Sequence, residues 1–213
     1  MNGVCFDMDG VLIHSEEFWV ERQREHILPT AALDDEIPMS AITGRNYAEL
    51  YPELESEYDL AVTREEFEAL FEAAGEEIYA EHATLLPGAH DLLSTLRERG
   101  VALALTTSSP VDWIALVDDR FDLLSYFDAV VSAETLDGPG KPAPDIYERG
   151  VAELGLSPDV CVAVEDSTAG ARAASRAGLW TIGFHGDGGA SDLSVADEVV
   201  EGSDALRAAL LRE

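Results

Sequence analysis

The stretch Val4-Cys5-Phe6-Asp7-Met8-Asp9-Gly10-Val11-Leu12 carries the strongest structural indication in this chain. Its apolar beginning predicts a short buried strand, which stops at two carboxylates separated by one residue and followed by a glycine. Two carboxylates this close repel each other unless a cation or a proton lies between them. Because ligands bind at the carboxyl ends of the strands in open α/β sheets, the stretch predicts the functional edge of such a sheet.

The composition describes a strongly acidic folded protein. The chain has 213 residues, a length that suits one α/β domain with a smaller domain attached. It contains 43 acidic and 13 basic residues, for a formal net charge of −30, while 46% of its residues are hydrophobic. This combination indicates a heavily solvated surface rather than a disordered tail. It disfavours nucleic acid and anionic membranes as partners, and we hypothesise that the surface is adapted to high salt.

The sequence carries no indication of a membrane or an oxidising compartment. No apolar run reaches spanning length, and no basic segment precedes the first strand, so we expect a soluble cytoplasmic protein. The two cysteines, Cys5 and Cys161, lie in strand-like apolar runs and are expected to be small buried hydrophobic residues. The sequence is compatible with a monomer and with a dimer.

Residues 15–83 are predicted to be helical throughout. Thr63-Arg64-Glu65-Glu66 is a capping-box pattern and begins the longest predicted helix. Pro29, Pro38 and Pro52 are expected to divide the preceding region into short helices joined by turns. No strand pattern occurs in this region.

From residue 84 onward, strand-like runs alternate with helical patterns. The alternation predicts βαβ units and a parallel sheet covered by helices on both faces. The predicted strands are 101–105, 129–132, 160–164, 179–183 and 198–200, and the predicted helices are 89–99, 110–119, 143–154, 168–177 and a last one from 203. Because the first strand belongs to this sheet, we expect residues 1–14 and 84–213 to form one domain, with residues 15–83 inserted as a second, helical domain.

Chemically reactive side chains follow the predicted strands. They are Asp7 and Asp9 after the first strand, Thr106-Thr107-Ser108-Ser109 after the second, Lys141 between the third and fourth, and Glu165-Asp166 after the fourth. In a parallel sheet these positions share one edge. Carboxylates, hydroxyls and one ammonium together fit phosphoryl transfer assisted by Mg²⁺, with an aspartate able to act as nucleophile.

Four segments of the chain resemble the four motifs of the haloacid dehalogenase superfamily, in the order typical of that superfamily. The segments are Phe6-Asp7-Met8-Asp9-Gly10-Val11-Leu12, Leu105-Thr106, Gly140-Lys141-Pro142-Ala143-Pro144-Asp145 and Val164-Glu165-Asp166-Ser167. With the helical insertion, which resembles the superfamily's cap domain, they account for nearly the whole chain. The resemblance implies an α/β fold: a Rossmann-like parallel sheet with helices on both faces, plus an inserted α-helical cap domain.

The resemblance also implies roles for individual residues. Asp7 would be the nucleophile, and Asp9 would be the general acid that later activates water. The implied Mg²⁺ ligands are Asp7, the backbone carbonyl of Asp9, Asp166 and Glu165. The implied phosphate-binding residues are Thr106, Lys141 and the amide of Thr107.

Lys141 is the single lysine among 13 basic residues. Its retention fits a phosphate-binding role, because the planar fork of an arginine does not replace a compact point charge. A structural ion pair is the alternative interpretation of Lys141. Arg45, in the helical region, is a weaker candidate for binding a substrate phosphate or carboxylate, and a surface salt bridge is an equally good interpretation of it.

The expected function is a Mg²⁺-dependent phosphatase that hydrolyses a small phosphorylated metabolite through an aspartyl-phosphate intermediate. Asp9 favours phosphate chemistry, because the dehalogenase branch does not place an aspartate two residues after its nucleophile. Within the phosphate branch, the DGVL and KPAPDIY segments resemble the phosphoglycolate phosphatase and β-phosphoglucomutase group, although His14 and Trp19 depart from its pattern. The alternatives are a phosphosugar mutase and a non-catalytic binding protein. The intact set Asp7, Asp9, Lys141 and Asp166 argues against the second alternative.

Overall fold

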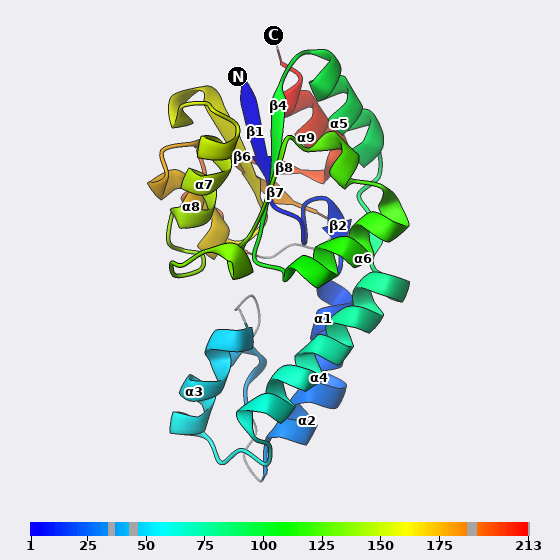
Figure 1. The fold of residues 1–213 in the computed structure, drawn as a ribbon, viewed down its shortest axis with the longest axis vertical. Helices are drawn as coiled ribbons and strands as arrows, with labels where there is room; N and C mark the ends of the chain where they lie inside the picture. Colours follow the sequence, from blue (N-terminus) through cyan, green and yellow to red (C-terminus); the bar gives the residue numbers. More distant parts are fainter. Residues whose placement is uncertain (34–36, 43–46, 187–190, 213) are drawn as a thin grey trace. The chain divides into compact units, whose positions relative to one another are not determined.

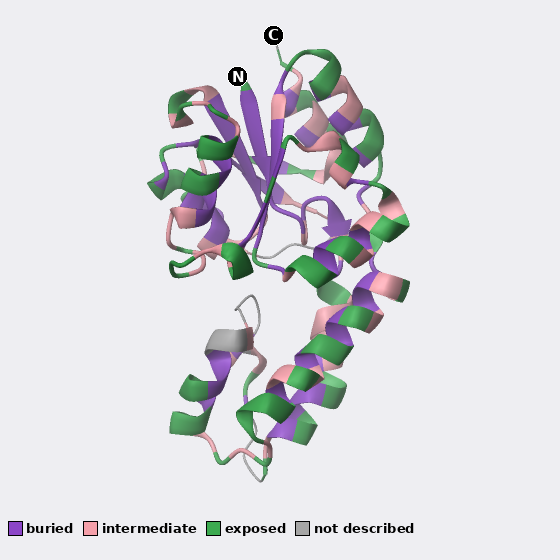
Figure 2. Cartoon of the chain, viewed as in Figure 1, coloured by how far each residue is buried: buried purple, intermediate pink, exposed green. Residues whose placement is uncertain are grey.

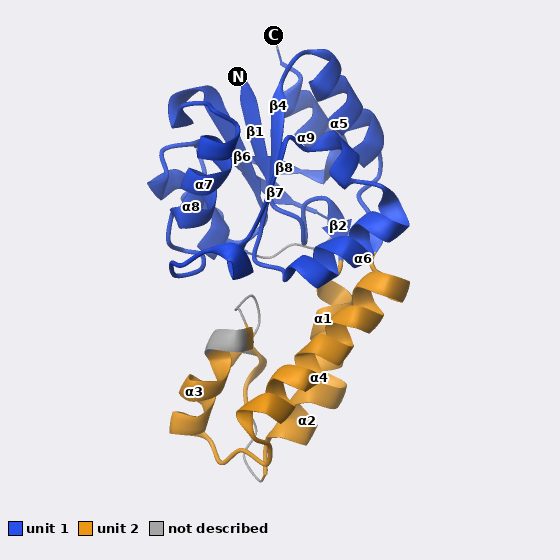
Figure 3. Cartoon of the chain, viewed as in Figure 1, with its two compact units in different colours: residues 1–14, 84–213 blue, residues 15–83 orange. Residues whose placement is uncertain are grey.

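The computed structural model describes residues 1–33, 37–42, 47–186 and 191–212. The chain divides into two compact units (Figure 3). The first, here called the core unit, comprises Met1–His14 and Thr84–Glu213, and the second, the helical unit, comprises Ser15–Ala83. Arg45 lies outside the described residues.

The core unit is built on a six-stranded sheet with the order β5-β4-β1-β6-β7-β8, in which all neighbouring strands are parallel. The strands are β1 (Gly3–Phe6), β4 (Ala102–Thr107), β5 (Ala129–Ser132), β6 (Cys161–Glu165), β7 (Trp180–His185) and β8 (Glu198–Glu201). Every residue of β1 is buried, as its apolar sequence predicts. Because β1 lies between β4 and β6, the acidic stretch that follows it emerges at the centre of the sheet.

Helices cover both faces of this sheet (Figure 1). They are α5 (Ala89–Glu98), α6 (Val111–Phe121), α7 (Asp145–Glu153), α8 (Thr168–Arg176) and α9 (Gly202–Leu210). Helices α7 and α8 pack on one face through a core that includes Cys5, Ala104 and Tyr147, while α5 and α9 lie on the other. Figure 2 shows the buried strands between helices whose outer surfaces are exposed. Three short 3₁₀ turns, Leu124–Tyr126, Ala133–Thr135 and Pro158–Val160, connect these elements.

A short antiparallel ribbon, which the sequence pattern did not predict, marks the two ends of the inserted region. It pairs β2 (Ile13–His14) with β3 (Thr84–Leu85), placing Ile13 beside Leu85 and His14 beside Thr84. The chain leaves the core unit immediately after β2 and re-enters it immediately before β3. Two residues per strand are too few to produce a recognisable alternation of apolar and polar residues.

The described part of the helical unit contains only helices and turns apart from one isolated bridge between Ala32 and Leu60. Its helices are α1 (Glu16–Arg22), α2 (Leu28–Ala31), α3 (Tyr47–Glu57) and α4 (Arg64–Glu77), with π-helical turns at Gln23–Ile27 and Ile78–His82 and a 3₁₀ turn at Met39–Ala41. The capping box at Thr63 is present, with the Glu66 amide bonded to the Thr63 hydroxyl and the Glu66 carboxylate bonded back to the Thr63 amide. Phe67 and Phe71 are buried in the core of this unit.

Two of the prolines do not break helices as predicted. Pro52 lies inside α3, and Pro29 lies near the start of α2. The Pro52 ring is exposed, while its neighbours Tyr51 and Leu54 are buried in the core of the helical unit, so packing outweighs the local cost of proline. No helix among the described residues has the length and apolar character that a membrane crossing would require.

Candidate active site

The site lies where three central strands end side by side. In the register of the sheet, Phe6 of β1 pairs with Leu105 of β4 and with Val164 of β6. The next residues along these strands are Asp7, Thr106 and Glu165, which therefore reach the same level of the carboxyl edge. This is the edge, next to the central strand, at which ligands bind in open parallel sheets.

Lys141 joins two buried carboxylates at this edge. Its Nζ donates to Asp7 Oδ1 at 2.6 Å, to Glu165 Oε1 at 2.6 Å and to the Thr106 carbonyl at 3.1 Å. The Lys141 side chain is only 7% exposed. Burial alone would lower the pKa of Lys141, but the two carboxylates outweigh it and raise the pKa, so the side chain is an ammonium.

The pKa of the Asp7 carboxyl group depends on its burial and on the charges around it. Burial raises the pKa of its carboxyl group, the Lys141 ammonium opposes this shift, and the Glu165 carboxylate adds to it. One ammonium is thus shared by two carboxylates. A second positive charge placed here would favour the ionised form of Asp7.

Glu165 is held by groups from three different elements. Its Oε1 accepts from Lys141 and from the Tyr147 hydroxyl, each at 2.6 Å, and its Oε2 accepts from the Ser167 hydroxyl at 3.0 Å. Glu165 is fully buried, and its carboxylate packs so closely on α8 that a side chain at Gly170 would collide with it. These bonds make Glu165 an anchor for Lys141.

Tyr147 is a site residue that sequence reasoning did not single out. It lies in the first turn of α7 and is fully buried. Burial raises the pKa of its hydroxyl, and the negative charge of Glu165 raises it further. A buried tyrosine on the apolar face of a predicted helix needs a hydrogen-bond partner for its hydroxyl. This need could have identified Tyr147 as a site residue from the sequence.

Asp166 completes a carboxylate cluster that suits a divalent cation. Oxygen atoms of Asp7, Glu165 and Asp166 lie within 4.8 Å of one another. Gly10 has φ +73°, and a Cβ atom there would collide with Asp166 Oδ2, so the carboxylate lies against the backbone that follows Asp9. Hard oxygen donors gathered in this way are the ligands that Mg²⁺ prefers.

The hydroxyl side chains after β4 are not equivalent. The Thr106 hydroxyl is buried and donates to the Phe6 carbonyl at 3.2 Å, so a phosphate contact would have to replace this bond. The Thr107 hydroxyl oxygen accepts from the Ser109 amide at 3.0 Å, and its own hydrogen can therefore be directed elsewhere. The Ser109 hydroxyl donates to Asp9 Oδ2 at 2.7 Å.

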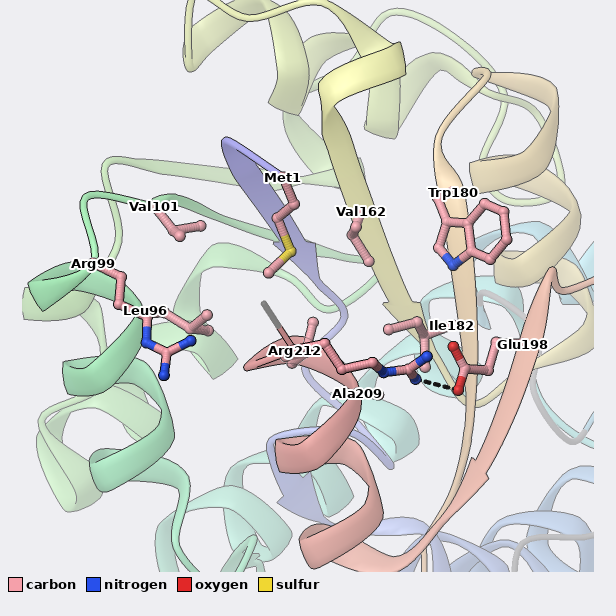
Figure 4. Close-up of a pocket in the computed structure, with 11 residues that line it drawn as sticks. Met1, Leu96, Arg99, Val101, Val162, Trp180, Ile182, Glu198, Ala209 and Arg212 are labelled. Carbon is pink, nitrogen blue, oxygen red and sulfur yellow. Dashed lines mark hydrogen bonds and ion pairs between the residues drawn. The ribbon is translucent and has the colours of Figure 1, made fainter.

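A separate pocket of about 430 Å³ lies at the opposite, amino-terminal ends of the strands (Figure 4). Met1, Trp180, Arg99 and the ion pair of Arg212 with Glu198 help to line it. None of the predicted site residues lines this pocket. The predicted site residues thus lie apart from this pocket.

The fold and the site together define an α/β protein that gathers carboxylates and one lysine at the carboxyl edge of the centre of a parallel sheet. The family model for haloacid dehalogenase-like hydrolases matches residues 1–178, and the chain belongs to this family. The predicted family and fold class are therefore confirmed.

Curated relatives refine the class of enzyme. Hexitol phosphatase B of Escherichia coli strain K12 is 33% identical over 189 residues, with 83% of this chain and 80% of the relative covered. A phosphorylated carbohydrates phosphatase of Thermotoga maritima is 30% identical over 179 residues, with 84% and 82% covered. These relatives confirm the prediction of a phosphoric monoester hydrolase.

A solved structure confirms the fold at lower identity. The crystal structure of β-phosphoglucomutase from Clostridium difficile superposes with a TM-score of 0.76 at 22% identity, with 97% of this chain and 93% of that chain covered. At this identity the likeness concerns the fold alone.

Proposed function

We propose that this chain is a Mg²⁺-dependent phosphatase that hydrolyses a small phosphorylated carbohydrate through an aspartyl-phosphate on Asp7. The observation that carries the proposal is the buried Lys141 ammonium, which lies 2.6 Å from Asp7 at the central edge of the parallel sheet. It supplies positive charge at the point where an anionic phosphoryl group would meet an anionic nucleophile.

The carboxylates of Asp7 and Asp166, with the backbone carbonyl of Asp9, are the groups that we propose as Mg²⁺ ligands. Glu165 belongs to the same cluster, but its oxygens already accept bonds from Lys141, Tyr147 and Ser167, so we assign it a supporting role. When bound, the ion would supply Lewis acidity at a phosphoryl oxygen and offset the charge on Asp7.

The reaction proceeds in two displacements on this assignment. An Asp7 oxygen attacks phosphorus as the bond to the leaving oxygen breaks, and a proton from the Asp9 carboxyl group converts the leaving oxygen to an alcohol. Asp9 then takes a proton from water as the water oxygen attacks phosphorus and the bond to Asp7 breaks. Lys141 and the Thr107 amide and hydroxyl would bind the phosphoryl oxygens in both steps, and Thr106 stays a predicted contact.

Phosphorylated carbohydrates are the proposed substrate class because hexitol and carbohydrate phosphatases are among the relatives. The alternative of a phosphosugar mutase predicts a different product from the same substrate, an isomer rather than free phosphate. Arg45 remains a candidate substrate contact.

The test measures phosphate release from 4-nitrophenyl phosphate and from a panel of hexitol phosphates, with Mg²⁺ or EDTA, in low and high KCl. Acid-quenched protein should carry phosphate on Asp7, and Asp7→Asn should lose both turnover and label. Asp159→Asn is the matched control, because it removes an equivalent charge from an exposed aspartate before β6. A fully active Asp7→Asn variant would refute the assignment, and isomerised product without phosphate release would favour the mutase.

A further inference from the structure

The Asp9 carboxylate accepts a hydrogen bond from Ser109, a residue to which the family motifs give no role. The Ser109 hydroxyl donates to Asp9 Oδ2 at 2.7 Å, and Ser109 is 6% exposed. Serine 109 lies beyond the end of β4, while Asp9 lies beyond the end of β1, so the bond connects two neighbouring strand ends.

Ser109 is itself held in place from two sides. Its amide donates to the Thr107 hydroxyl oxygen at 3.0 Å, and its carbonyl accepts from the Ser132 hydroxyl at 2.7 Å. The Ser132 hydroxyl in turn accepts from the Glu134 amide at 3.2 Å. The backbone of Ser109 is therefore fixed between β4 and β5, close to the Asp9 carboxyl group that its hydroxyl contacts.

The backbone around Asp9 is fixed as well. The Gly10 amide donates to the Ile13 carbonyl at 2.8 Å, and the Leu12 amide donates to the Met8 carbonyl at 2.9 Å, which closes a tight turn. With the turn fixed, the side-chain torsions decide where the Asp9 carboxyl group points.

We propose that Ser109 is a positioning residue that orients Asp9 for proton transfer. The inference rests on the proposed function, because it concerns how Asp9 delivers a proton to the leaving oxygen and later receives one from water. The hydrogen bond to Oδ2 restricts the side-chain torsions of Asp9 and so sets the direction in which its carboxyl group faces the leaving oxygen.

Proton transfer to the leaving group gives this role a specific kinetic signature. An alcohol of high pKa needs the proton in order to leave, whereas 4-nitrophenolate leaves readily without it. The parameter kcat/KM covers the steps up to release of this first product, so its dependence on the leaving group reports on the general acid. A change that disturbed the fold alone would reduce kcat/KM for both substrates by the same factor.

The experiment compares wild type with Ser109→Ala on a hexitol phosphate and on 4-nitrophenyl phosphate. We expect kcat/KM to fall about 10-fold to 100-fold on the hexitol phosphate, part of the 10²-fold to 10⁴-fold that a general acid contributes, and less than about threefold on the aryl phosphate. Ser109→Thr keeps a hydroxyl and should recover most of the loss. Ser125→Ala, which removes an exposed hydroxyl bonded only locally to the Asp122 carbonyl among the bonds described, should match wild type.

A second variant keeps the inference testable if Ser109→Ala does not fold. Ser132→Ala removes the hydrogen bond to the Ser109 carbonyl without changing a group that contacts Asp9. It should also lower kcat/KM more on the hexitol phosphate than on the aryl phosphate, but by a smaller factor than Ser109→Ala. Equal losses on both substrates, or unchanged kinetics in Ser109→Ala, would overturn the inference while leaving the phosphatase assignment intact. A wild type that releases no phosphate from either substrate would overturn both.

Discussion

Replacing Lys141 by methionine removes the ammonium that joins two buried carboxylates while keeping most of the volume of the side chain. The Glu165 side chain is fully buried and that of Asp7 is 10% exposed, so neither can regain full hydration. Removing one partner of a buried ion pair costs about 3–5 kcal/mol, because the remaining charge is uncompensated. At about 2–4 °C per kcal/mol for a chain of this size, the melting temperature of the core unit should fall by roughly 6–20 °C.

Calorimetry in EDTA and moderate KCl measures this effect without a bound cation. Arg149→Met is the matched control, since it also removes one positive charge from an acidic chain, but its side chain is 60% exposed and pairs with Glu153 one helical turn away. Such exposed pairs contribute little, so the control should melt close to wild type.

A double variant separates loss of charge from loss of packing. Adding Glu165→Gln to Lys141→Met removes one of the two uncompensated carboxylates and should restore part of the stability, with a coupling free energy of about 0.5–3 kcal/mol. The reasoning fails if Lys141→Met melts with the Arg149→Met control, or if the effects of the two substitutions simply add.

Three further predictions follow from the structure. Gly10→Ala should lower activity about 100-fold, because its Cβ collides with Asp166, whereas Gly100→Ala, which has φ +77° but no atom within 4 Å of a Cβ, should lose some stability and keep its activity. Burial raises the pKa of Cys5 to about 12 and also raises that of Cys161, so neither thiol should react with Ellman's reagent at pH 8 before unfolding, and rapid labelling of the native protein would contradict this. The free energy of unfolding should rise with KCl as the Debye length falls from about 10 Å at 0.1 M to about 3 Å at 1 M, and a flat dependence would exclude repulsion as a significant cost at net charge −30.

The strand ends were predictable because each reactive residue directly follows a continuous apolar run. In a parallel sheet, a residue that follows a strand lies at the carboxyl edge, whatever the order of the strands. Asp7, Thr106 and Glu165 could therefore be placed at the same edge from the sequence alone. Lys141 required more, since it lies in a loop between β5 and α7. Lys141 is the single lysine in the sequence, and its segment resembles a family motif. These two observations together placed it at the site.

The partners of these residues were not predictable in the same way. Whether Thr106 or Thr107 can offer a hydroxyl hydrogen depends on bonds to Phe6 and Ser109 that follow from the strand register. The bonds from Tyr147 to Glu165 and from Ser109 to Asp9 connect residues 18 and 100 positions apart. Local propensity and periodicity carry no information about such contacts, which arise only once the order of the strands is established.

Asp7 and Asp9 carry the same chemical group but lie in different surroundings. Asp7 is buried, which raises the pKa of its carboxyl group, and it lies against the Lys141 ammonium, which opposes this rise. Asp9 is more exposed and accepts a hydrogen bond from the neutral hydroxyl of Ser109, which follows β4. The two carboxyl groups, separated by one residue in the sequence, therefore have different hydrogen-bond partners. The roles that we propose, nucleophilic attack by Asp7 and proton transfer by Asp9, place the two reactions in these two different environments.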